Sequence, residues 1–236
     1  MPIVDPNDLA ATLEALNDAL FFGRAVPKSE RAQIAKWIAS RQGLPGSYRG
    51  MPAPTEGNFR EPVRVFTGET VGSRAGTAHI LGEEACRALI LLGTSQVGVQ
   101  DALERSTEWL RAWLAEGQEA RTGRYCCCRC SVALWRHVAV SELPGAEACL
   151  AAGVSTLADR REATGRWQGF PFWYTVFALN QMELAGAEAE IRHAVPALER
   201  FLRGRAGAGK VHQRRTALAE KVLGRGASPP GPLSFA

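Results

Sequence analysis

Four cysteines lie close together in the middle of the chain, at Cys126, Cys127, Cys128 and Cys130. Cys127 and Cys130 form a C-x-x-C pair, whose two thiolates could share one zinc ion at about 2.3 Å per bond. The spacing therefore predicts a metal site formed by Cys127, Cys128 and Cys130, with zinc as the candidate cofactor. Two alternatives stay open at this point: a redox-active thiol pair, and inert cysteines at the start of a helix.

His137 lies on the same stripe as Cys130 if a helix begins inside the cysteine cluster. The helix between them spans roughly 10 Å, which is too far for His137 and Cys130 to bind one zinc ion. Cys126, Cys128 and His79 are less constrained, and they are the candidates for additional ligands.

His79 and Glu83 share one face of a predicted helix, at positions i and i+4. Such a pair is common as a surface contact. In a cavity, however, an imidazole and a carboxylate can act as general acid and base. We therefore take His79, Glu83 and His137 as candidate catalytic residues.

Apolar residues recur at helical spacing along most of the chain, and strand-like alternation is nearly absent. We therefore predict an all-α protein in which Asp5 or Asn7 caps the first of about nine helices. The expected helices cover residues 8–22, 28–41, 77–92, 100–116, 127–141, 146–161, 171–185, 188–203 and 210–223.

The helices are expected to form one domain over residues 1–223, interrupted by a long loop rich in Pro and Gly at residues 44–76. Residues 224–236 contain a Ser-Pro-Pro-Gly-Pro run and are predicted to be a disordered tail. The chain of 236 residues is long enough to bury one substantial core.

The composition excludes several classes of protein. With 46% hydrophobic and 22% charged residues, the chain is expected to fold. No apolar run approaches the roughly 18 residues of a membrane span, and the first residues lack the pattern of a secretory signal. We therefore expect a cytoplasmic protein. The net charge is +4, but the basic residues near the C-terminus lack interleaved aromatic residues, so nucleic acid is not the expected partner.

A structural unit recurs three times along the chain: a helix, a turn that ends in Gly-x-aromatic, and a second helix. The three turns are Gly46-Ser-Tyr48, Gly123-Arg-Tyr125 and Gly165-Arg-Trp167. One helix pair cannot bury its own apolar face, so neighbouring pairs are expected to stack.

This repeat resembles the α/α-toroid repeat of terpenoid cyclases and protein prenyltransferase β subunits, over roughly residues 28–185. The stretch 165–179 is the closest match. The resemblance implies an enzyme with a central cavity that is lined by the inner helices and takes an apolar or isoprenoid-like small molecule. It also implies that the aromatic residues of the turns, Tyr48, Tyr125 and Trp167, stitch helices together rather than act in catalysis.

The resemblance extends to the residues that hold the catalytic zinc of protein prenyltransferases. Gly123-Arg124 precedes the cluster as in that family, which places Cys130 at the position of the zinc-binding cysteine. Cys128 stands in place of the family's aspartate, and Tyr174 stands in place of its histidine. Tyr174 is therefore the fourth candidate catalytic residue.

The length limits the architecture that this resemblance allows. Complete toroids of these families use five or more helix pairs, whereas about nine helices make four pairs and one extra helix. An open arc or a minimal ring is expected, its ends covered by the 44–76 loop or by a second copy of the chain in a homodimer. The alternative to an enzyme is a non-catalytic helical-repeat protein that binds another protein, with structural or metal-binding cysteines. A metal or redox sensor is a third alternative.

Overall fold

The computed structural model describes residues 3–117, 120–204 and 207–224. These residues contain ten α-helices, one 3-10 helix and isolated β-bridges but no strand, so the all-α prediction is confirmed. In chain order the helices are α1 (Leu9–Phe21), α2 (Lys28–Ala39), α3 (Glu56–Arg60), α4 (Arg74–Leu92), α5 (Val97–Glu116), η1 (Ala120–Thr122), α6 (Cys128–Val138), α7 (Ala146–Ala158), α8 (Phe172–Leu179), α9 (Ala185–Arg203) and α10 (Lys210–Leu223). The predicted tail lies outside the described residues, apart from Gly224.

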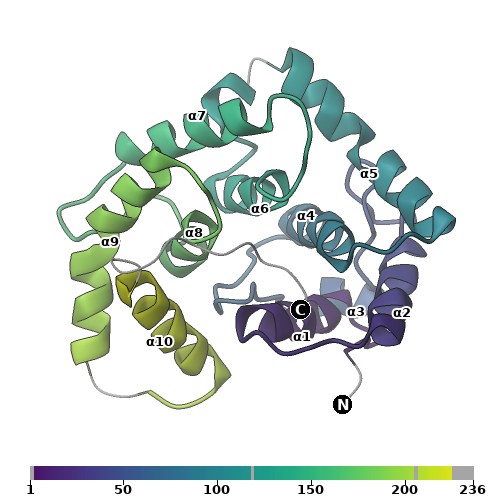
Figure 1. Cartoon of the computed structure of the whole chain (residues 1–236), viewed down its shortest axis with the longest axis horizontal. Helices are drawn as coiled ribbons and strands as arrows, with labels where there is room; N and C mark the ends of the chain where they lie inside the picture. Colours follow the sequence, from purple (N-terminus) through teal and green to yellow (C-terminus); the bar gives the residue numbers. More distant parts are fainter. Residues whose placement is uncertain (1–2, 118–119, 205–206, 225–236) are drawn as a thin grey trace.

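The helices form an inner and an outer layer (Figure 1). Along the chain, α4, α6 and α8 lie towards the middle of the molecule, and they alternate with α5, α7 and α9 on its edge. All eight residues of α8 are buried, as are most residues of α4 and α6. Helices that are buried on all sides belong to the interior, whereas the outer helices keep a polar face for solvent.

Helix α10 joins the two ends of this arrangement, because it packs on α9 and is tied to α1 by a buried arginine. Arg214 donates to Glu14 at 2.7 Å and to Asp18 at 2.9 Å, and it also reaches the carbonyl oxygen of Phe66 at 3.3 Å. Helix α10 therefore connects the two ends of the arc of helices that the sequence predicts.

The repeated turns adopt the conformation that the glycines indicate. Gly46, Gly123 and Gly165 have φ values of +87°, +60° and +78°, in the left-handed region that favours glycine. Each turn packs closely on a neighbouring segment, and the indole of Trp167 donates to Glu190 of α9 at 2.7 Å. The turns thus connect an inner helix to an outer one.

The 44–76 segment is more structured than the predicted loop, because it contains α3 and a hairpin-like turn over residues 63–71. Glu69 of this turn accepts a hydrogen bond from the backbone N–H of Tyr174 at 2.9 Å, and so satisfies one of the free donors at the start of α8. The first helix is also capped differently from the expectation. Its N-cap is Asp8, whose carboxylate accepts from the N–H of Ala11.

Within the described residues, none of the helices has the length and apolarity needed to cross a lipid bilayer.

Gly123→Ala is expected to destabilise the fold much more than Gly43→Ala. Both glycines have a positive φ, which alone costs about 1–2 kcal/mol in any other residue. A Cβ at Gly123 would lie 2.0 Å from the backbone nitrogen of Gly153, whereas nothing lies within 4 Å of one at Gly43. Urea denaturation should therefore show a loss of about 3 kcal/mol or more for Gly123→Ala. Equal losses in the two variants would contradict this packing.

Candidate functional site

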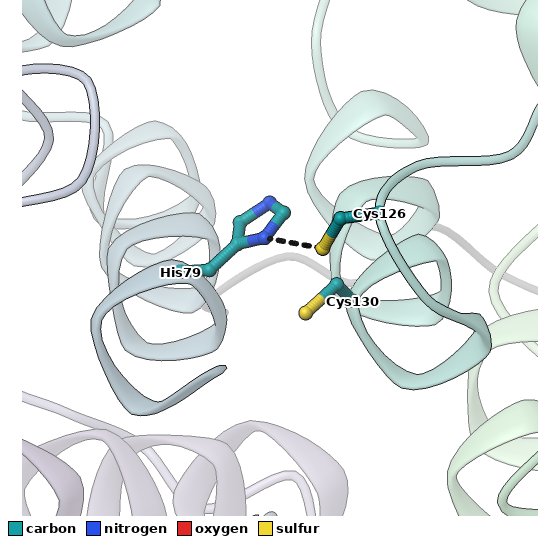
Figure 2. Close-up of side chains that lie close together, drawn as sticks. All are labelled: His79, Cys126 and Cys130. Carbon is teal, nitrogen blue, oxygen red and sulfur yellow. Dashed lines mark hydrogen bonds between the residues drawn. The ribbon is translucent and has the colours of Figure 1, made fainter. Parts of the chain in front are cut away.

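The clearest group of metal-binding side chains lies between α4 and α6. It consists of His79 in the second turn of α4, Cys130 in the first turn of α6, and Cys126 just before α6. Their ligand atoms all lie within 4.8 Å of one another, and the Nδ1 atom of His79 is 3.5 Å from the sulfur of Cys126. Figure 2 shows the imidazole facing the two sulfur atoms across the gap between the helices.

This set of donors fits a thiophilic divalent cation. Two thiolates and one imidazole are ligands that zinc prefers, and tetrahedral zinc ligands lie about 3.5–4 Å apart. Burial raises the pKa of Cys130, and partial loss of hydration raises that of Cys126, although this residue is exposed on one side. Without a cation both groups therefore stay protonated near neutral pH, and a bound cation would stabilise their thiolates.

The other two cysteines of the cluster lie differently. Cys127 is the N-cap of α6, and its sulfur accepts from the N–H of Cys130 at 3.4 Å. Burial alone would raise its pKa, but the hydrogen bonds from this N–H and from its neighbours lower it. The sulfur of Cys128 lies 3.5 Å from the position of a Cβ at Gly169. Of the predicted ligands Cys127, Cys128 and Cys130, only Cys130 belongs to the group around His79.

The imidazole of His79 is held between two aromatic rings of the repeated turns. Tyr48 stacks on it at a centroid distance of 4.3 Å, and Tyr125 meets it edge-on at 4.4 Å. The two phenol oxygens are 2.5 Å apart and share a hydrogen bond. Burial raises the pKa of Tyr125, so its hydroxyl stays protonated near neutral pH. These turn residues connect structural elements, as expected, and they also fix the plane of the His79 ring.

Glu83 lies between two histidines. One carboxylate oxygen is 3.3 Å from Nε2 of His79, and the other is 2.7 Å from Nδ1 of His137 on α6. All three side chains are buried. Burial acts to raise the pKa of Glu83, but its interactions with His137 and His79 outweigh this effect and leave the pKa below its usual value. The predicted pairing of His79 with Glu83 is present, and it is a buried contact rather than a surface one.

The neighbouring Glu84 belongs to a second polar cluster, at the centre of the molecule. Arg136 of α6 donates to both of its carboxylate oxygens, at 2.5 and 3.2 Å, and the hydroxyl of Tyr174 donates to one of them at 2.5 Å. Arg136 also donates to Asn17 of α1 and to Gln181. Side chains from α1, α4, α6 and α8 thus meet around one carboxylate.

This central cluster is rich in charge. Burial acts to raise the pKa of Glu84, but Arg136 outweighs it and lowers the value to about 2. Arg87 is also buried there and donates to Asn17 at 3.0 Å, and burial together with repulsion from Arg136 lowers its pKa to about 9. A crevice of about 20 Å³ beside Asn17 and Glu84 has room for one water molecule.

The structure therefore brings some of the predicted residues together and separates others. His79, Glu83 and His137 form one chain of contacts, and Cys130 adjoins it. Tyr174 belongs to the cluster around Glu84 instead. Cys126, which the spacing indicated only as an additional ligand, is a central member of the group. The sequence did not predict a role for Glu84 or Arg136, because the two residues form a buried ion pair only when α4 and α6 pack together. The adjacent Glu83-Glu84 pair was the feature of the sequence that could have indicated this cluster.

Comparison of the chain with protein-family models, with curated proteins and with solved structures finds no significant match.

The stability that Glu84 contributes is expected to be lost in acid. Its carboxyl has a pKa of about 2 in the folded protein against 4.5 as the ordinary value, so the unfolded chain takes up the proton first as the pH falls. A shift of this size corresponds to roughly 3 kcal/mol, which disappears between about pH 5 and pH 2. The difference in unfolding free energy between wild type and Glu84→Gln should shrink by this amount over that range.

Urea denaturation at several pH values measures this difference. Glu56→Gln is the control, because Glu56 forms only an exposed pair with Arg60. If the difference in unfolding free energy between wild type and Glu84→Gln stays constant from pH 7 to pH 2, Glu84 is not held as a buried anion.

Proposed function

We propose that this chain is a metalloprotein, in which His79, Cys126 and Cys130 bind one zinc ion at an enzymatic site. The observation that carries the proposal is the convergence of these three donors from two separate segments to within 4.8 Å. Three protein ligands are typical of catalytic zinc, which keeps a fourth position for water or substrate, whereas structural zinc has four.

The surroundings support an accessible metal. Cys126 and Cys127 are exposed, so one side of the site faces solvent, while His79 and Cys130 form its buried side. When bound there, zinc would act as a Lewis acid that lowers the pKa of a water or thiol in its open position. The protein contributes the fixed imidazole, the paired aromatic rings and an exposed cysteine ligand.

The alternation of inner and outer helices supports the resemblance to α/α-toroid enzymes, because the inner helices α4 and α6 carry two of the candidate ligands, His79 and Cys130. The apolar or isoprenoid-like substrate stays a prediction, as do the homodimer and the cytoplasmic location. Incubation with isoprenyl diphosphates of several chain lengths, followed by mass spectrometry of the products, tests the substrate class. A lack of turnover at every chain length would count against it.

Elemental analysis and zinc titration of the reduced protein test the metal site. We expect about one zinc per chain, and a loss of affinity of roughly 100-fold or more in Cys126→Ser and Cys130→Ser, because removing a ligand should cost more than removing its supporting groups. Cys128→Ser is the matched control, since this sulfur lies against Gly169, and it should bind zinc like the wild type. A wild-type protein that takes up no stoichiometric zinc would refute the proposal.

A structural zinc site is the second candidate, and the position of Cys127 favours it. Cys127 stands between Cys126 and Cys130 in the chain, and its sulfur accepts from the N–H of Cys130 at 3.4 Å, so a rotation of its side chain could add a fourth ligand. This reading fits the non-catalytic helical-repeat protein that was the alternative from the sequence.

Cobalt substitution separates the two candidates, because sulfur-to-cobalt charge-transfer absorption scales with the number of bound thiolates. In Cys127→Ser we expect this absorption and the melting temperature of the metal-bound protein to match the wild type. A structural four-ligand site would instead lose about one third of the absorption, as three thiolates become two, and would melt at a lower temperature.

A further inference from the structure

Glu83 bridges the proposed metal ligand His79 and a second buried histidine. Its side chain is fully buried on α4, one turn after His79, and its carboxylate contacts one nitrogen of each imidazole. The contact with His137 is a short hydrogen bond of 2.7 Å, and His137 belongs to α6, the helix that carries Cys130. Glu83 therefore has contacts on both sides of the metal site.

The two nitrogens of His79 face different partners. Nδ1 points to Cys126, at 3.5 Å, and Nε2 points to Glu83, at 3.3 Å. Nε2 of His79 and Oε1 of Glu83 are both buried and lie 3.3 Å apart, and neither atom forms a hydrogen bond of good geometry among the described residues. Each is thus the natural partner of the other, since buried polar groups without a partner are costly.

A metal binds the imidazole nitrogen that carries no proton. A neutral imidazole has one N–H and one free lone pair, and an ionised carboxylate can only accept hydrogen bonds. With Glu83 beside Nε2, the proton is favoured there, and the lone pair of Nδ1 is left towards Cys126 and Cys130. Stacking on Tyr48 and the edge-on contact with Tyr125 hold the plane of the ring between these partners.

We infer that Glu83 is a positioning residue, which selects the form of His79 with Nδ1 free for the metal, and that His137 holds Glu83 in place. The inference rests on the proposed metal site and names the group that prepares it. Carboxylate–histidine–metal chains of this kind orient the ligand and raise its basicity, and their loss typically costs 10–100-fold in metal affinity.

Glu83→Gln is the first test. A glutamine side chain has one oxygen and one NH2 group, so it can accept from only one of the two imidazoles and must donate to the other. We expect zinc affinity, measured by competition with a chromophoric chelator, to fall by about 10–100-fold. Glu190→Gln is the matched control, because it makes the same change at another buried glutamate, which pairs with Arg161 and Trp167 away from α4 and α6, and it should change the affinity less than about threefold.

Histidine NMR tests the inference without relying on a variant. The chain has only four histidines, so long-range ¹H–¹⁵N spectra of the metal-free wild type can be resolved and assigned. We expect His79 to carry its proton on Nε2, and to shift towards the Nδ1-protonated form in Glu83→Gln. Glu83→Asp, which keeps the charge on a shorter side chain, should retain the wild-type form in part.

The outcomes separate this inference from the proposed function. If the wild type binds zinc but His79 carries its proton on Nδ1 in the metal-free protein, or if Glu83→Gln binds zinc as the wild type does, Glu83 does not position the ligand, and the metal site stands. If the wild type binds no zinc, both the site and the role of Glu83 are refuted.

Discussion

The pairing of two adjacent carboxylates on α4 with two adjacent basic residues on α6 is the interaction on which this structure depends. Glu83 binds His137 at 2.7 Å, and Glu84 binds Arg136 at 2.5 Å. Both pairs are buried, where an unpaired charge would cost several kcal/mol. The register between the two helices is therefore fixed, since sliding either helix by one residue would break both pairs.

That register places the candidate metal ligands opposite one another. His79 lies one turn before Glu83, and Cys130 lies about two turns before His137. Both ligands therefore precede their helix's paired residues, and the two helices run in the same general direction. The cost of burying charge at the centre of the molecule thus determines the geometry of a site near its surface. The two polar clusters stay distinct, although Glu83 and Glu84 are neighbours in the chain, because each carboxylate pairs with a different residue of α6.

The repeated turns serve the scaffold and the site together. Their glycines allow the chain to reverse close to neighbouring helices, and Trp167 uses its turn to anchor α9. Tyr48 and Tyr125 occupy the equivalent positions in the two earlier turns, and there they enclose the ring of His79. The aromatic residues of two repeated turns therefore also surround the side chain of a proposed metal ligand.

The sequence by itself determined the helical class, the approximate helices, the three glycine turns, the clustering of the cysteines and the contact of His79 with Glu83. These features depend on local periodicity and on residues a few positions apart, which is why they are readable without the fold. The cap of the first helix was misassigned for a local reason, because Asp8 was the better placed of several adjacent polar residues.

Only the tertiary structure decided which cysteines face His79. The C-x-x-C pattern paired Cys127 with Cys130 on the assumption that a helix begins near Cys127. The helix does begin there, at Cys128, but Cys127 is its N-cap with extended dihedral angles (φ −152°, ψ 164°), so the chain before α6 is not helical and the sulfur of Cys126 faces His79 of α4. Which sulfur reaches the imidazole thus depends on the phase of α6, and on a contact between residues far apart in the chain. The spacing of the cysteines in the sequence predicts neither the phase of the helix nor the long-range contact.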